Sequence, residues 1–294
     1  MRKFVILLSL VSFTFMGYTQ THAAADYNKR PVEINVNGKF ISMDVHPTMD
    51  NNRLFIPIRS LASLGIHYSW NPSSKVVTLQ NKNGEYLKIT VGSKVAYKGS
   101  QKIQMDQAAK NQDGRVLVPI RFVSETLGYH VDYETLRKMV FVNSDSYKFD
   151  MNQMTQENLQ AARKAAISLP IKFDFKPLDS SGVYHEYSFP VGRADVYMLL
   201  DGRNTTLVEI KNGKAMAIGQ FADDDRSKTS GAIPPNFIFD TDPLFEAYHN
   251  SSVLFIENRY EGSAIAIYNN ENGKRVELNT KVNVYSDIIQ KLPK

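Results

Sequence analysis

The chain has 294 residues and an apolar content of 43%, which is ordinary for a globular protein and predicts packed cores. Cysteine is absent, which excludes disulfide bonds, thiol chemistry, Cys-ligated metals and a lipid-modified cysteine. The formal net charge of +5 falls to +3 without Arg2 and Lys3. This mild basicity does not indicate nucleic-acid binding, but it favours contact with anionic wall polymers.

The first 25 residues are typical of a secretory signal. Two basic residues precede an apolar run at 4–16, and small residues end before Asp26, where we expect cleavage. The run is shorter than the roughly 20 apolar residues that span a bilayer, and no second apolar span follows. We therefore expect a secreted or wall-associated protein, with no transmembrane anchor in the mature chain. An exported chain without cysteine suits a Gram-positive envelope.

The length that remains after residues 1–25 predicts two domains. The polar stretch 143–152 is typical of a linker. We therefore assign a duplicated module to residues 26–147 and a second domain to residues 148–294.

The N-terminal part contains one motif twice. Residues 53–59 read RLFIPIR, and residues 115–121 read RVLVPIR. In each copy the apolar triplet predicts a short strand, which the proline ends because it cannot donate to a sheet ladder. The same proline is a favourable first residue of a helix. Each motif therefore predicts a strand followed by a short helix.

Both helices are expected to end at a left-handed glycine, Gly65 and Gly128. The first copy has one residue fewer between proline and glycine, so we expect its helix to be shorter or distorted. After each glycine an alternating pattern predicts a strand that ends at an aromatic residue, Trp70 or Tyr133. A duplicated strand–helix–strand unit mainly serves to bury apolar surface between its copies, and catalytic sites are rarely duplicated in this way.

The other strands of this half follow from period-two patterns and turn residues. An Asn-Gly hairpin is expected at 37–38. Further strands are expected at 40–45, 75–79, 86–91, 94–97 and 138–142. Together these elements predict an antiparallel sheet that carries two small helices.

The combination of an apolar triplet, Pro-x-Arg, a helix ending in Leu-Gly and a strand bearing Trp70 resembles the stalk-type domain at the N-terminus of some copper amine oxidases. Such modules occur singly or in tandem in exported proteins of Gram-positive bacteria. The resemblance covers about residues 32–143. It implies an antiparallel sheet wrapped on a helix. It does not imply oxidase activity, because copper and the quinone belong to a separate catalytic domain that nothing here resembles.

The candidate binding positions are those of the motif, and we interpret them as structural. An arginine at a helix start can tie that helix to carbonyls or a carboxylate, or it can bind a ligand. The aromatic residues can cover the core or offer a carbohydrate platform, although the family favours Trp where the second copy has Tyr. These positions are Pro57, Arg59, Gly65, Trp70, Pro119, Arg121, Gly128 and Tyr133.

The histidines do not indicate a metal site. His67 and His130 hold equivalent places in the two copies, on the face opposite the aromatic residues, where exposure to solvent explains them. No His-x-His or His-x-x-x-His spacing is present in the mature chain. We therefore expect no metal and no cofactor.

The C-terminal half is predicted to be mostly strands. Thr155 is expected to cap a helix that runs to about Ile167 and ends before Pro170. A second short helix is expected from Asp242. Strands are expected at 194–200, 206–211, 215–221, 253–258, 264–268 and 276–285.

One short pattern in this half is similar to the Asp…Glu-x-Lys core of restriction-endonuclease-like nucleases. Asp195, Glu209 and Lys211 would be the catalytic residues, with the carboxylates holding a divalent cation and the lysine positioning water. Against this, Asn212-Gly213 predicts an immediate hairpin, whereas the nuclease strand continues. Exposed strands also carry these residue types routinely.

The sequence therefore predicts an α+β protein that is exported and not an enzyme. A stalk-type module would position a C-terminal domain that binds a cell-wall polymer or a surface protein. One alternative is an exported metal-dependent hydrolase that uses Asp195, Glu209 and Lys211. The other is a purely structural wall spacer.

Overall fold

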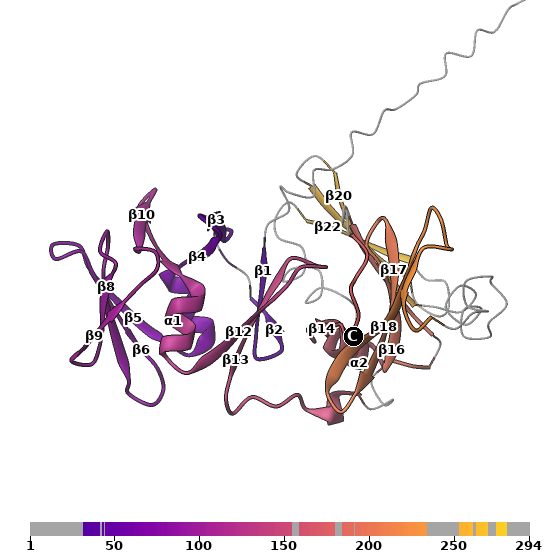
Figure 1. Cartoon of the computed structure of the whole chain (residues 1–294), viewed down its shortest axis with the longest axis horizontal. Coiled ribbons are helices and arrows are strands. Elements are labelled where there is room, and N and C mark those ends of the chain that lie inside the picture. Colours follow the sequence, from indigo (N-terminus) through magenta and orange to yellow (C-terminus); the bar gives the residue numbers. More distant parts are fainter. Residues whose placement is uncertain are drawn as a thin grey trace, which may run out of the picture.

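The computed structural model describes residues 32–41, 43, 45–154, 159–179, 184–190, 192–233, 253–260, 263–269 and 275–280. The expected signal segment, the cap at Thr155 and the helix expected from Asp242 lie outside these residues. The described part consists mostly of sheet with short helices, which confirms the α+β class at this level (Figure 1). No helix in it is long and apolar enough to cross a bilayer.

The N-terminal half contains three small sheets and two short helices. The strand orders are β12-β13-β1-β2, β10-β11-β4-β3 and β5-β6-β7-β8-β9. The elements are β1 (Glu33–Val36), β2 (Lys39–Phe40), β3 (Thr48–Asp50), β4 (Arg53–Pro57), η2 (Ile58–Leu64), β5 (His67–Asn71), β6 (Val76–Gln80), β7 (Tyr86–Thr90), β8 (Val95–Lys98), β9 (Gln101–Gln104), β10 (Lys110–Gln112), β11 (Arg115–Pro119), α1 (Ile120–Thr126), β12 (Tyr129–Glu134) and β13 (Met139–Ser144).

The two motif strands, β4 and β11, pair with each other in the central sheet. Ile56 lies opposite Val118, and Pro57 lies opposite Leu117. Ile56 and Val118 hold the same position in the motif, so this register relates the two copies by an approximate two-fold rotation. The outer strands repeat the relation, because β3 pairs with β4 as β10 pairs with β11.

The helix after each motif begins directly at the proline, as the sequence predicts. The second copy forms the α-helix α1, whereas the first forms the 3-10 helix η2. A 3-10 helix has fewer residues per turn, which fits the shorter spacing between Pro57 and Gly65. Gly65 and Gly128 have φ values of +72° and +82°, so both glycines stop their helices in the left-handed region as expected.

A first core lies between the three N-terminal sheets and the two helices. Leu61 of η2 and Val123 of α1 are fully buried in it. Ile34 and Val142 reach it from the β12-β13-β1-β2 sheet. Helices of about two turns are unstable alone in water, so η2 and α1 depend on this core.

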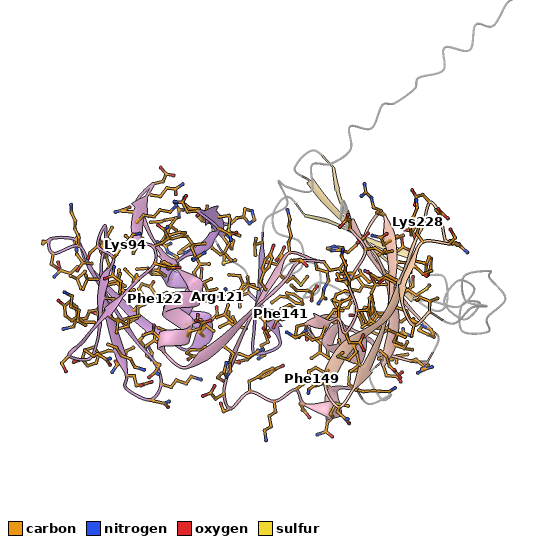
Figure 2. The ribbon with its side chains drawn as sticks, viewed as in Figure 1. Lys94, Arg121, Phe122, Phe141, Phe149 and Lys228 are labelled. Atoms are coloured by element: carbon orange, nitrogen blue, oxygen red, sulfur yellow. The ribbon has the colours of Figure 1, made fainter. Side chains whose placement is uncertain are left out.

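The β12-β13-β1-β2 sheet is shared between two cores. Val140 and Val142 of β13 face the first core. Met139 and Phe141 alternate with them and belong to a second core, which also contains residues of the C-terminal half (Figure 2). The two halves of the chain are therefore joined through a continuous apolar layer.

The segment expected to be a linker also takes part in this packing. Asn143 and Ser144 continue β13. Phe149 packs against the second core (Figure 2), and Met154, just after the stretch, does the same. Polar composition predicted a linker here, but the Phe149 side chain anchors the stretch to the protein.

The described residues of the C-terminal half form one large sheet, the helix α2 and the short 3-10 helix η3. The strand order is β14-β18-β17-β16-β15-β20-β21-β22, and β19 pairs with β18. The elements are η3 (Met151–Met154), α2 (Leu159–Ile167), β14 (Ile171–Lys172), β15 (Tyr184–Phe189), β16 (Val196–Leu200), β17 (Asn204–Lys211), β18 (Lys214–Ala222), β19 (Thr229–Gly231), β20 (Val253–Tyr260), β21 (Ser263–Asn269) and β22 (Arg275–Thr280).

Two strand pairs differ from the expected antiparallel arrangement. β1 pairs in parallel with β13, and β14 pairs in parallel with β18. Parallel neighbours cannot be joined by a tight hairpin. Both pairs join strands far apart in the chain, which local turn patterns cannot predict.

Candidate functional site

The most developed polar site in the described part of the chain is a buried ion pair at the junction of the two halves. Glu134 ends β12, and Arg137 lies in the turn that leads to β13. The Arg137 Nε lies 2.6 Å from Oε1 of Glu134, and one Nη lies 2.5 Å from Oε2. The two side chains are 0% and 4% exposed. This bidentate geometry is the strongest form of an arginine–carboxylate contact.

The remaining donors of Arg137 bind the end of α2. Its two Nη atoms donate to the carbonyl oxygens of Ile167 and Leu169, each at 2.7 Å. The last carbonyls of a helix have no partner within the helix, so Arg137 caps α2 from the other half of the chain. Glu134 also accepts a 2.9 Å hydrogen bond from the backbone N–H of Ile171. We call Glu134 and Arg137 the junction pair.

The electrostatic surroundings keep Arg137 charged. Burial acts to lower the pKa of Arg137, but the charge of Glu134 and the hydroxyls of Tyr187 and Tyr197 outweigh it and raise the pKa well above its ordinary value. The guanidinium also lies 5.8 Å from the centre of the Phe141 ring. Arg137 therefore retains its charge inside the protein.

This arrangement positions elements and offers no reactive group. These hydrogen bonds of the junction pair hold the β12–β13 turn against the end of α2 and the start of β14. Breaking a buried pair by removing one partner costs about 3–5 kcal/mol, because the other charge is left without compensation. This site could not be predicted from the sequence, since Glu-x-x-Arg in a polar turn is indistinguishable from surface charge.

The motif arginines lie at the surface. Arg59 is exposed on η2. The Arg121 side chain is 61% exposed, and its Nε lies 3.7 Å from Glu125 on the same helix (Figure 2). The prolines contribute to the central sheet, where Pro57 and Pro119 are both buried.

The aromatic motif positions differ in their surroundings. Trp70 is partly buried and packs against the first core, whereas Tyr133 is 41% exposed. Tyr129, which the sequence did not single out, links the two copies because its hydroxyl donates to the carbonyl oxygen of Leu64 at 2.8 Å.

The histidines of the two copies are both exposed, as the alternation predicted. His130 lies 2.8 Å from Asp145, and both side chains are more than three-quarters exposed at 78% and 77%. The described residues contain no cluster of three or more His, Asp or Glu side chains that could hold a metal ion.

The nuclease-like residues Asp195, Glu209 and Lys211 form ion pairs with residues close to them in the sequence. Both Asp195 oxygens accept hydrogen bonds of 2.9 Å from Arg193, and this contact lowers the pKa of Asp195. Lys211 lies 2.7 Å from Glu209. The register places Val196, not Asp195, opposite Glu209.

The expected hairpin after Lys211 is confirmed. Lys211 pairs with Lys214, and Asn212 and Gly213 have φ values of +51° and +71°, which is typical of a type I′ turn. β17 therefore returns at once as β18. Glu209 and Lys211 are neighbours two residues apart on β17, whereas Asp195 is bound by Arg193.

A different acidic pair, Glu186 on β15 and Asp223 directly after β18, was not predicted. Partial burial raises the pKa of Glu186, and the charge of Asp223 raises it further. Desolvation also raises the pKa of Asp223, although the 2.7 Å hydrogen bond from Thr205 opposes this. Both carboxyl groups therefore hold their protons to a higher pH than they would in the unfolded chain.

Comparison with known proteins identifies the N-terminal part only. Residues 35–142 match the family described as copper amine oxidase N-terminal domain, which confirms the resemblance seen in the repeated motif. In copper amine oxidases this domain is not the catalytic one. The match covers a little more than a third of the chain. No curated protein matches the sequence.

Proposed function

We propose that this is an exported envelope or extracellular protein without enzymatic activity. Its tandem stalk-type module, residues 26–147, positions a C-terminal binding domain, residues 148–294. The ligand of the whole protein would be a cell-wall polymer or a surface protein. The signal-like residues 1–25 support export, and a Gram-positive envelope suits the cysteine-free composition.

The junction pair is the observation that supports a positioning role most directly. A flexible tether would need only a linker, but here Arg137 caps α2 and Glu134 binds Ile171 across the two halves. The second core adds apolar contacts between the same elements. A module that is bound in this way holds the C-terminal sheet in one orientation.

The approximate two-fold relation between β4 and β11 supports the tandem interpretation. The equivalent pairs Ile56–Val118 and Gly65–Gly128 fall at matching places in the two copies. Duplication of a strand–helix–strand unit gives a scaffold whose copies bury each other's apolar faces. A spacer without any ligand uses the same scaffold, so binding is the property that separates the two proposals.

Export and binding can each be tested. In cells, N-terminal sequencing of the secreted or wall fraction is expected to show a mature chain that begins at Asp26. Retention of the purified mature chain on isolated cell walls would support the binding role, and its absence would favour a spacer or a soluble partner. Recovery of the full chain, residues 1–25 included, from the cytosol would overturn the proposal. Full-length protein is needed, because cutting near residue 148 would divide the second core.

A further inference from the structure

We infer that the outward face of the five-stranded sheet β5–β9 binds a phosphate-bearing anionic glycopolymer. This inference deepens the proposed function by naming a partner and the surface that contacts it. It rests on the proposed function only because the protein must be exported to meet a polymer of the cell envelope. The sheet lies at the end of the N-terminal half away from the C-terminal sheet (Figure 1).

The net positive charge of the protein is concentrated in this sheet and its turns. Residues 67–104 contain six lysines, one glutamate and neither aspartate nor arginine, which gives a local net charge of +5. The formal charge of the whole chain is also +5, so the rest of the chain is neutral overall. The sequence shows no basic run, because the lysines are spread along the chain. Lys88 and Lys102 lie on the outward face of the sheet, whereas Lys98 lies opposite Leu87 on the other face. The other three lysines lie in the turns that join the strands.

The outward face combines lysines with exposed tyrosines. Lys88 lies directly opposite Tyr97, and Tyr97 lies opposite Lys102. Tyr86 and Tyr97 are 40% and 44% exposed. We define the lysine face by the outward residues of the middle strands: Thr78, Tyr86, Lys88, Thr90, Tyr97 and Lys102.

The lysines of this face are available to a ligand. The single glutamate of the sheet, Glu85, is already paired with Lys98 at 3.0 Å. In the described part of the chain, no carboxylate forms an ion pair with Lys88, Lys94 or Lys102. Lys88 lies 5.6 Å from the centre of the Tyr86 ring, a contact that leaves its charge in place. Lys94 adds a further exposed cation at one end of the sheet (Figure 2).

The chemistry of the face favours a phosphorylated or otherwise acidic sugar polymer over other polyanions. Lysine binds phosphate as a point charge, whereas bidentate recognition in nucleic acids is typical of arginine, which the sheet lacks. Tyrosine rings and threonine hydroxyls suit the mixed apolar and polar faces of sugars. A lipid surface would need large apolar side chains that insert, whereas the apolar residues of this face other than the two tyrosines are the partly buried Val76 and Val95.

Cross-strand spacing suits a repeating ligand. Neighbouring strands lie about 4.8 Å apart, so Lys88 and Lys102, which are two strands apart, carry charges on the order of 10 Å from each other. A polymer with regularly spaced phosphates can contact both lysines while a sugar or polyol unit lies over Tyr97. The row Thr78–Lys88–Tyr97–Lys102 crosses four strands at one level.

The test measures binding of residues 26–294 to poly(glycerol phosphate), with uncharged dextran and single-stranded DNA as comparison probes. The wild-type chain is expected to bind the phosphate polymer with an affinity that falls as salt is raised. The double variant Lys88→Gln/Lys102→Gln is expected to bind about thirtyfold more weakly, since each lysine near an anionic surface contributes about 1 kcal/mol.

The matched control is Lys148→Gln/Lys214→Gln, which removes the same charge from exposed positions in the C-terminal half. It is expected to leave the affinity within about twofold of wild type, because surface charge far from a contact is screened. Equal losses in both double variants would overturn the inference in favour of non-specific attraction. Tighter binding of DNA than of the phosphate polymer, or no binding of the polymer, would also overturn it.

The inference and the proposed function can fail separately. Binding of poly(glycerol phosphate) through the lysine face would stand even if the chain were found in the cytosol, although export would then be wrong. Conversely, if the chain is exported but does not bind poly(glycerol phosphate), the inference is overturned and the proposal of export still stands.

Discussion

Arg137 donates a 2.7 Å hydrogen bond to the carbonyl oxygen of Leu169, 32 residues further along the chain. The same guanidinium is paired with Glu134, so one buried side chain joins a turn of the N-terminal module to the end of α2. Burying a charge costs desolvation free energy. The presence of Arg137 at the junction therefore indicates that it fixes the geometry between the two halves.

Replacing Arg137 with methionine removes the donors while keeping a long apolar side chain. Glu134 is then buried without its partner, and the carbonyl groups of Ile167 and Leu169 lose their donors. We expect the free energy of unfolding to fall by about 3–5 kcal/mol. Urea denaturation followed by circular dichroism measures this change.

Arg121→Met is the matched control for this variant. The Arg121–Glu125 pair is exposed on one helix face, and such pairs contribute about 0.3–0.5 kcal/mol. If Arg137→Met costs no more than Arg121→Met, the junction pair does not stabilise the protein.

The double variant Glu134→Leu/Arg137→Met tests whether the lone carboxylate causes the loss. Removing both charges avoids an uncompensated charge in the interior, so the double variant is expected to be more stable than Arg137→Met alone. It should remain less stable than wild type, because Ile171 N–H and the capped carbonyls lose their partners. A double-mutant cycle of unfolding free energies measures the coupling, and strictly additive losses would contradict it.

The acidic pair of the C-terminal sheet predicts a distinct pH dependence. Because the pKa of Glu186 is raised in the folded protein, the unfolded chain releases this proton first as pH rises. Its contribution to stability is therefore full below the unfolded pKa of about 4.3 and is lost as pH rises through the folded pKa. Glu186→Gln should gain stability relative to wild type between about pH 4 and pH 7.

Glu85 provides a comparison in which the pH dependence of stability has the opposite sign. Its hydrogen bond with Lys98 lowers its pKa, so its contribution is present above the unfolded pKa and is lost as pH falls. Glu85→Gln should lose stability relative to wild type over the same rise in pH. Unfolding curves at about pH 4 and pH 7 measure the free energy of unfolding of each variant relative to wild type. If this difference changes in the same direction with pH for both variants, the opposite pKa shifts assigned to Glu186 and Glu85 are contradicted.

The hydrolase alternative has its own test. Asp195 is bound by Arg193 and Glu209 by Lys211, so we expect the mature chain not to cut DNA in the presence of Mg²⁺. The assay follows linear and supercoiled DNA on gels, with and without EDTA. Mg²⁺-dependent cutting that disappears in Lys211→Ala would establish the alternative and overturn the non-enzymatic proposal.

Local features of the fold were predictable because each rests on residues close in sequence. The Asn-Gly turns at 37–38 and 212–213 have the positive φ values that their hairpins require. The motif prolines and glycines fixed the start and end of η2 and α1. The missing residue in the first copy correctly indicated a distorted helix.

The junction and the lysine face depend on contacts that the sequence does not display. The pairing of β1 with β13 joins distant strands, and it gives β13 two apolar faces, with Val140 on one side and Phe141 on the other. Only that arrangement buries Arg137 beside α2. Similarly, Lys88 and Lys102 are separated in the sequence and share one face of the sheet only after the meander has folded.

The central claim is that the N-terminal module holds the C-terminal sheet in a fixed orientation. The chain has no cysteine, so Lys94→Cys and Lys228→Cys, both at exposed positions, place one spin label on each half (Figure 2). Double electron–electron resonance is expected to give a single narrow distance distribution, which broadens when Arg137→Met is added. A broad or multiple distribution in the chain with Arg137 intact would contradict the account.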